Sequence, residues 1–254
     1  MRRPAPRAAL LVVTLTALAA ATVACGRADQ PETTVLTVHA AASLREPFEQ
    51  LAREFEAEHD GVEVRLNVAG SADLVAQVTE GAPADVVATA DTATMDTLAA
   101  DDLVNEVTPF ATNTLVIVVP PGNPAGVAGL DDLAGDLDLV VCAPQVPCGA
   151  ATAQVETAAG LTFTPVSEEQ SVTDVLGKVR AGEADAGLVY VTDVEAAGGD
   201  VEGVAFPEAR DAVNTYPVAV ATGSDHPSLA RAFADLVTSL AGEQVLTSAG
   251  FDRP

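Results

Sequence analysis

Five residues of this sequence are suited to holding an anion with neutral hydrogen-bond donors. Ser43, Ser71, Cys148 and Val172 each fall at or near the expected start of a helix, where backbone N–H groups lack a partner within the helix. Tyr190 falls near the end of an expected strand and supplies a phenolic hydroxyl. For any one of them alone, helix capping or core packing explains the residue better than ligand binding does. They form a site only if the fold brings them together.

Other chemistries have less support. The three histidines, His39, His59 and His226, are scattered and have no ligand partner at helical or zinc-finger spacing. The sequence has no Gly-x-Ser-x-Gly motif to present a nucleophile and no glycine-rich phosphate loop. We therefore expect a protein that is not an enzyme and that carries neither a cofactor nor a metal cation.

Two cysteines, Cys142 and Cys148, are separated by five residues that include two prolines. In an oxidising compartment a disulfide is the leading interpretation, with a redox pair or two buried free thiols as alternatives. So short a loop contributes only about 2 kcal/mol through chain entropy. Cys148 also immediately precedes an expected helix, so its backbone N–H is available at the helix start.

Residues 1–24 have the pattern of an export signal. Three arginines precede an apolar stretch that is too short for a transmembrane helix, and small residues lead to Cys25. This segment resembles the signal peptide of a bacterial lipoprotein, in which Cys25 would be lipidated and residues 25–34 would form a flexible tether. Thr22 replaces the usual leucine, and an ordinary secretory signal is the alternative. A lipid anchor implies a cell-envelope protein, held at the outer face of the membrane in the periplasm or at the cell surface.

The mature chain is strongly acidic. After removal of the leader's three arginines, 9 basic residues face 37 acidic ones, a net charge of −28 compared with −25 for the whole chain. Such a surface repels nucleic acid and acidic membranes. Any anion must therefore be bound by neutral donors.

Short apolar runs alternate with helical patterns along the mature chain, which predicts an α/β fold with mostly parallel sheets. The run at residues 114–119 is either a central strand or a crossover between lobes. Strands are expected at residues 35–38, 62–68, 85–89, 137–142 and 186–191, and a second crossover between the lobes at 216–221. Helices are expected at 44–55, 72–80, 95–100, 149–159 and 172–181, with one or more final helices over 228–249.

Several motifs, in order along the chain, resemble those of the molybdate-binding proteins of ABC importers. The most specific is Gly-Ala-Pro-Ala-Asp at residues 81–85, followed by a strand and Ala-Asp at 90–91. The others are Ala-Ala-Ser-Leu at 41–44, Gly-Ser-Ala-Asp-Leu at 70–74, Gly-Leu-Val-Tyr at 187–190 and Tyr-Pro-Val-Ala at 216–219.

The resemblance implies a type II periplasmic-binding-protein fold, in which two doubly wound lobes are joined by two crossover segments and the ligand lies in the cleft. Residues 35–112 and 216–254 would form lobe 1, and residues 113–215 lobe 2. A monomer is expected, with an ABC permease as its partner.

The resemblance also implies which residues hold the ligand. Ser43 and Ser71 would donate their hydroxyls, Cys148 and Val172 their backbone N–H groups, and Tyr190 its phenol. Cys148 replaces an alanine that is usual in the family. Because the family uses the N–H at that position, the change is compatible with binding.

A molybdate dianion has only acceptor oxygens, so its pocket needs donors and no carboxylate. Nearly isosteric tungstate should also bind, whereas smaller sulfate would be distinguished by cavity size. A receptor for another oxyanion, such as sulfate or phosphate, or for an organic anion, is the alternative. An enzyme on this fold is a more distant one.

Overall fold

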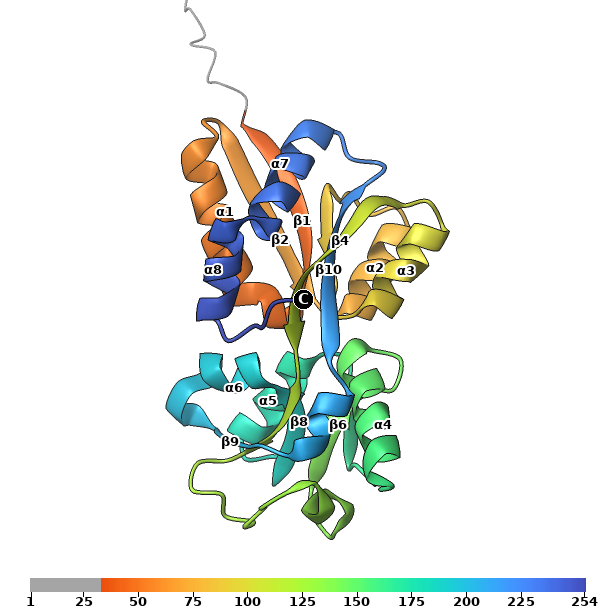
Figure 1. Cartoon of the computed structure of the whole chain (residues 1–254), viewed down its shortest axis with the longest axis vertical. Helices are drawn as coiled ribbons and strands as arrows, with labels where there is room; N and C mark the ends of the chain where they lie inside the picture. Colours follow the sequence, from red (N-terminus) through yellow and green to blue (C-terminus); the bar gives the residue numbers. More distant parts are fainter. Residues whose placement is uncertain (1–32) are drawn as a thin grey trace, which may run out of the picture. The chain divides into compact units, whose positions relative to one another are not determined.

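The structure, a computed structural model, describes residues 33–254, which form two lobes that each contain a five-stranded sheet (Figure 1). The predicted signal peptide, the predicted lipidation site at Cys25 and residues 25–32 of the predicted tether lie outside the described residues.

The first sheet has the strand order β2-β1-β3-β10-β4 and is mixed. Three of its strands pair in parallel: β1 (Thr34–Ala41) runs parallel to β2 (Val62–Ala69) and to β3 (Val86–Ala88). By contrast, β10 (Asn214–Ala221) is antiparallel both to β3 and to β4 (Val104–Asn113).

Helices cover both faces of this sheet. On one face, α1 (Arg45–Glu58) buries Phe48, Leu51, Ala52 and Phe55, whose spacing places them on one side of the helix. The ring of Phe55 meets that of Phe233 in α7 edge-on, with centroids 5.3 Å apart. A separate cluster that includes Val75, Met95 and Leu98 packs α2 and α3 onto the other face. The helices besides α1 are α2 (Ser71–Thr79), α3 (Thr92–Ala100), α7 (Pro227–Thr238) and α8 (Leu240–Ser248).

The second sheet has the strand order β7-β6-β8-β5-β9 and is also mixed. Here β6 (Leu139–Cys142) is parallel to β7 (Ser167–Glu169) and to β8 (Ala186–Tyr190). The fully buried β5 (Leu115–Val119) is antiparallel to β8 and to β9 (Glu202–Val204). The helical elements of this lobe are η2 (Leu130–Ala134), α4 (Pro147–Ala159), α5 (Val172–Arg180), α6 (Val191–Ala197), η3 (Gly198–Asp200) and η4 (Pro207–Asp211).

The chain crosses from the first sheet to the second next to two residues that are paired in the first sheet. Asn113, the last residue of β4, is the register partner of Asn214, the first residue of β10. The Asn113 side chain donates a hydrogen bond to Thr192 Oγ1 of the second lobe at 2.8 Å. The carboxyl-terminal segment lies against the same region, where Asp252 forms an isolated bridge with Thr112 (Figure 1).

Most of the expected elements are present, but the short strands β7 and β9 and the helix α6 were missed. The expectation of mostly parallel sheets was wrong, because β5 and β10 run antiparallel to their neighbours. Residues 115–119 form an interior strand, which resolves the alternative left open. The edge strand β4 was missed: its middle residues are exposed, it contains Pro109, and it shows no apolar alternation.

Candidate functional site

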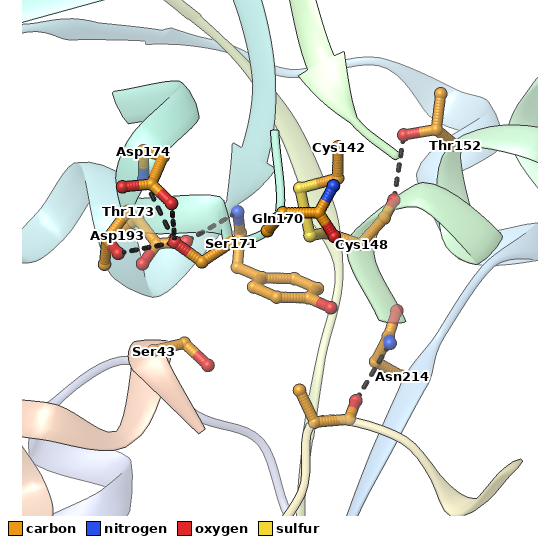
Figure 2. The surroundings of a disulfide bond; sticks show 12 residues. Ser43, Cys142, Cys148, Thr152, Gln170, Ser171, Thr173, Asp174, Asp193 and Asn214 are labelled. Carbon is orange, nitrogen blue, oxygen red and sulfur yellow. Dashed lines mark hydrogen bonds between the residues drawn. A yellow bond between two sulfur atoms is a disulfide. The ribbon is translucent and has the colours of Figure 1, made fainter. Parts of the chain in front are cut away.

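One small cavity, of ≈ 20 Å³, lies where the two lobes meet. All five residues predicted to hold an anion line it, and they come from both lobes. The full lining is Ala41, Ala42, Ser43, Gly70, Ser71, Ala90, Val146, Pro147, Cys148, Gln170, Ser171, Val172 and Tyr190. Figure 2 shows Ser43 on the ribbon of the first lobe, across from Gln170, Ser171 and Cys148 of the second.

Ser71 is positioned by the start of α2. Its Oγ accepts a hydrogen bond from the Ala90 N–H at 3.0 Å, so its own proton is free to be donated. The first bond of the helix runs from the Leu74 N–H to the Gly70 carbonyl at 3.0 Å. The N–H groups of residues 71–73 therefore have no partner within the helix, and this end of α2 favours negative charge.

Ser43 lies in η1 (Ala42–Leu44), the 3-10 turn that precedes α1. Its Oγ is 3.1 Å from the hydroxyl oxygen of Tyr216, a buried residue of β10. If the Tyr216 hydroxyl donates to Ser43, the serine proton remains available to a ligand. Sequence reasoning predicted the role of Ser43 but missed that of Tyr216. The signal that could have pointed to Tyr216 is that the chain has only two tyrosines.

Cys148 is the second residue of α4, after Pro147, and is buried. The Ala150 N–H makes the first intrahelical bond, to the Val146 carbonyl at 2.9 Å, so the N–H groups of Cys148 and Gly149 have no partner within the helix. The disulfide between Cys142 and Cys148 is present, which confirms that interpretation (Figure 2). It ties the end of β6 to the start of α4 beside the cavity.

Val172 begins α5, and the residue before it is a well-formed cap. Ser171 Oγ donates to Asp174 Oδ2 at 2.6 Å and accepts from the Asp174 N–H at 3.3 Å. Ser171 lines the cavity, but these bonds commit its hydroxyl to capping. The N–H groups of Val172 and Thr173 have no partner within the helix. Ser171 was also missed, although the Ser-x-x-Asp spacing before the helix is a capping signature.

Tyr190 provides a buried donor without a partner. Its side chain is 1% exposed, and its hydroxyl oxygen is buried with no hydrogen-bond partner among residues 33–254. Burial raises the pKa of the Tyr190 phenol well above its usual value, so the hydroxyl keeps its proton. An unsatisfied buried hydroxyl costs about 1–3 kcal/mol, and a ligand oxygen in the cavity would remove that cost.

Tyr190 is fixed from two sides. Its backbone N–H donates to Asp193 Oδ2 at 2.9 Å, and its ring meets the Tyr216 ring edge-on with centroids 5.9 Å apart. Burial raises the pKa of the Asp193 carboxyl from 3.8 to about 7, although the bond from Tyr190 opposes the rise.

The cavity's lining contains no charged side chain among the described residues. A larger cavity, of ≈ 360 Å³, lies beside it and shares Ala42 and Ser43. That cavity is lined by the carboxyl groups of Glu46, Asp193 and Glu195 as well as by two arginines. Carboxylates repel a dianion. The small cavity is therefore the better anion site.

Residues 33–254 contain no cluster of histidine, cysteine and acidic side chains able to hold a metal ion. His39, for example, is buried with its Nε2 3.1 Å from the Pro83 carbonyl oxygen, as a structural residue would be. Among the same residues, no helix is both long and apolar enough to cross a membrane.

The two lobes and their mixed sheets, with the cavity between them, have the type II periplasmic-binding-protein fold. Residues 36–252 match the family model of the bacterial extracellular solute-binding proteins, and the chain belongs to that family.

Named relatives support a closer relationship. The molybdate-binding protein ModA of Mycobacterium tuberculosis is 49% identical over 221 residues, which cover 86% of this chain and 85% of the relative. ModA of Escherichia coli is 31% identical over 85% of this chain and 88% of the relative. The solved Azotobacter vinelandii periplasmic molybdate-binding protein has a TM-score of 0.75 at 23% identity and covers 86% of this chain and 99% of its own. These relatives are binding proteins, and this chain is not an enzyme.

Proposed function

We propose that this protein captures molybdate outside the cytoplasm and delivers it to an ABC permease. The observation that carries the proposal is the convergence of donors from both lobes on one uncharged cavity, where the Tyr190 hydroxyl has no protein partner. The relatives' molybdate-binding names support the same ligand.

In the proposed complex, Ser43 and Ser71 donate hydroxyl protons from the first lobe. Cys148 and Val172 donate backbone N–H groups from the second lobe, and Tyr190 donates its phenol. The starts of α2, α4 and α5 add the positive ends of their helix dipoles. The dianion is thus neutralised without a basic side chain, cofactor or metal cation, which suits a chain with a large negative charge.

The anion would also hold the lobes together, because it accepts hydrogen bonds from both. A ligand that bridges two lobes favours their closed arrangement by the difference between its affinities for the closed and open states. We take the hinge to lie at the paired residues Asn113 and Asn214, so that residues 113–215 move as one lobe in a monomeric receptor.

The lining also bears on selectivity. Tungstate offers nearly the same size and the same acceptors as molybdate and should bind similarly. Hydrogen phosphate carries a proton that needs an acceptor, and the lining offers no carboxylate for it. Sulfate matches molybdate in charge and acceptors, so its exclusion rests on size. A sulfate receptor is therefore the alternative function.

Isothermal titration of the purified protein with the four oxyanions tests the proposal. We expect tight, comparable binding of molybdate and tungstate, and much weaker binding of sulfate and phosphate. Sulfate bound as tightly as molybdate would replace the proposed function with the alternative.

We further propose that Cys25 is lipidated and anchors the protein to the outer face of the membrane, on the basis of the leader's pattern. Mass spectrometry of the mature amino-terminal peptide tests this. A Cys25→Ala variant should be lost from the membrane fraction, and its retention there would contradict the anchor.

A further inference from the structure

A glycine of the first lobe packs directly against a backbone carbonyl of the second. A Cβ atom placed on Gly70 would lie 2.4 Å from the Gln170 carbonyl oxygen and 3.4 Å from its carbonyl carbon. The shorter distance lies inside van der Waals contact, so any side chain at residue 70 would force the two backbones apart. The observed spacing of the lobes therefore depends on the absence of a side chain at this position.

The first lobe itself does not require this glycine. Gly70 has φ −58° and ψ 140°, a conformation open to every L-residue. Within the first lobe, Asp73 Oδ2 would lie 3.6 Å from the added Cβ, which is ordinary van der Waals contact. Gly70 is also the N-cap of α2, where serine is preferred over glycine. Alanine or serine here is thus compatible with the fold of the lobe and incompatible with the observed spacing of the two lobes.

The contact adjoins donors on both sides of the cavity. Gly70 immediately precedes Ser71, and Gln170 lies two residues before Val172. The Gln170 side chain does not make the contact; its Oε1 accepts from Gln145 Nε2 at 3.2 Å in an exposed position. The two backbones therefore meet directly, and their contact sets the closest approach of Ser71 to the turn that carries Val172.

We infer that the contact between Gly70 and the Gln170 carbonyl is the stop that limits closure, which makes Gly70 a positioning residue for the oxyanion site. The inference rests on the proposed function. A side chain at residue 70 holds the lobes apart by several tenths of an ångström or more. The hydrogen bonds from the donors of one lobe to the bound anion then become longer. Weakening one or two hydrogen bonds to a charged ligand lowers affinity by roughly tenfold or more. The loss should appear in the dissociation rate, because encounter with the open protein is unchanged.

The experiment compares the wild type with Gly70→Ala and Gly70→Ser. Molybdate affinity is measured by isothermal titration, and dissociation rates by stopped-flow tyrosine fluorescence, which is informative because the chain has no tryptophan and both its tyrosines lie at the site. The matched controls are Gly129→Ala and Gly129→Ser. Gly129 is also an N-cap glycine, has extended backbone, and has nothing within 4 Å of an added Cβ.

We expect both Gly70 variants to bind molybdate roughly tenfold or more weakly, with faster dissociation and an unchanged association rate. The unliganded melting temperature should stay the same, or rise slightly for Gly70→Ser, and the Gly129 variants should bind like the wild type. If the wild type binds molybdate and the Gly70 variants bind it equally tightly, the inference is overturned and the proposed function stands. A fall in unliganded stability that parallels the loss of binding would also overturn it. A wild type that does not bind molybdate would remove the proposed function and this inference with it.

Discussion

The hydroxyl oxygens of Ser43 and Tyr216 lie 3.1 Å apart, and this contact links a cavity-lining serine to a buried tyrosine of β10. Burial raises the pKa of the Tyr216 phenol above its usual value, so it remains a donor. Tyr216→Phe keeps the ring contacts with Phe251 and Tyr190 but frees the serine hydroxyl to rotate. We expect molybdate affinity to fall by roughly fivefold to tenfold, about the worth of one hydrogen bond. Titration calorimetry measures this, and unchanged affinity would show that Ser43 needs no such partner.

Tyr190→Phe should separate binding from stability. The substitution removes a buried hydroxyl that has no protein partner, so the unliganded protein should be as stable as the wild type or up to about 2 kcal/mol more stable. Molybdate affinity should fall by roughly tenfold to a hundredfold, because a donor to a charged ligand is lost. Urea unfolding and calorimetry provide the two measurements.

Ser43→Ala serves as the companion to Tyr190→Phe. It should also weaken binding without unfolding the protein. Full affinity in both variants would mean that the ligand site lies elsewhere.

Asp193 should make the free energy of unfolding depend on pH. Its carboxyl has a pKa of about 7 in the folded protein, raised by burial, against 3.8 in the unfolded chain. Between these values the folded protein holds a proton that the unfolded chain has released. The contribution of Asp193 to stability is therefore largest below about pH 4, falls as pH rises toward 7, and is constant above that.

Asp193→Asn keeps an oxygen that can accept from the Tyr190 N–H and removes the titration. As pH rises from 5 to 8 the wild type loses the contribution of Asp193, whereas the variant has none to lose. The unfolding free energy of the variant minus that of the wild type should therefore be larger at pH 8 than at pH 5, on the order of 1.4 kcal/mol for each unit of pKa shift in that window. Urea unfolding at both pH values tests this. An equal difference at the two pH values would contradict the raised pKa.

The disulfide between Cys142 and Cys148 should matter more for stability than for binding. Replacing both cysteines by alanine should cost about 2 kcal/mol of unfolding free energy, because the closed loop is short. Since the proposed ligand is held by the backbone N–H of residue 148, molybdate should still bind, with a loss of less than about tenfold. A complete loss of binding would show that the disulfide itself shapes the site.

Sequence reasoning reached the residues of the site because local signals placed them. Ser71 and Val172 stand at the starts of helices that amphipathic spacing reveals, and Tyr190 ends a buried strand. Their motifs also resemble those of a known family, which supplied the fold and the ligand that local patterns alone do not give.

The features that were missed depend on tertiary contacts. The Tyr216 hydroxyl acquires its role from Ser43, which lies 173 positions away in the chain. The close approach of Gly70 to Gln170 joins two lobes, and no local pattern distinguishes Gly70 from an ordinary N-cap glycine. The strand β4 was overlooked because an exposed edge strand needs no apolar alternation.

The most direct test of the central claim is a crystal structure of the protein grown with molybdate, with anomalous diffraction data collected at the molybdenum absorption edge. The account predicts one strong anomalous peak in the small cavity. The oxygens of the anion around that peak should lie within hydrogen-bonding distance of Ser43, Ser71 and Tyr190. A peak in the larger cavity beside Asp193, or no peak between the lobes, would contradict it.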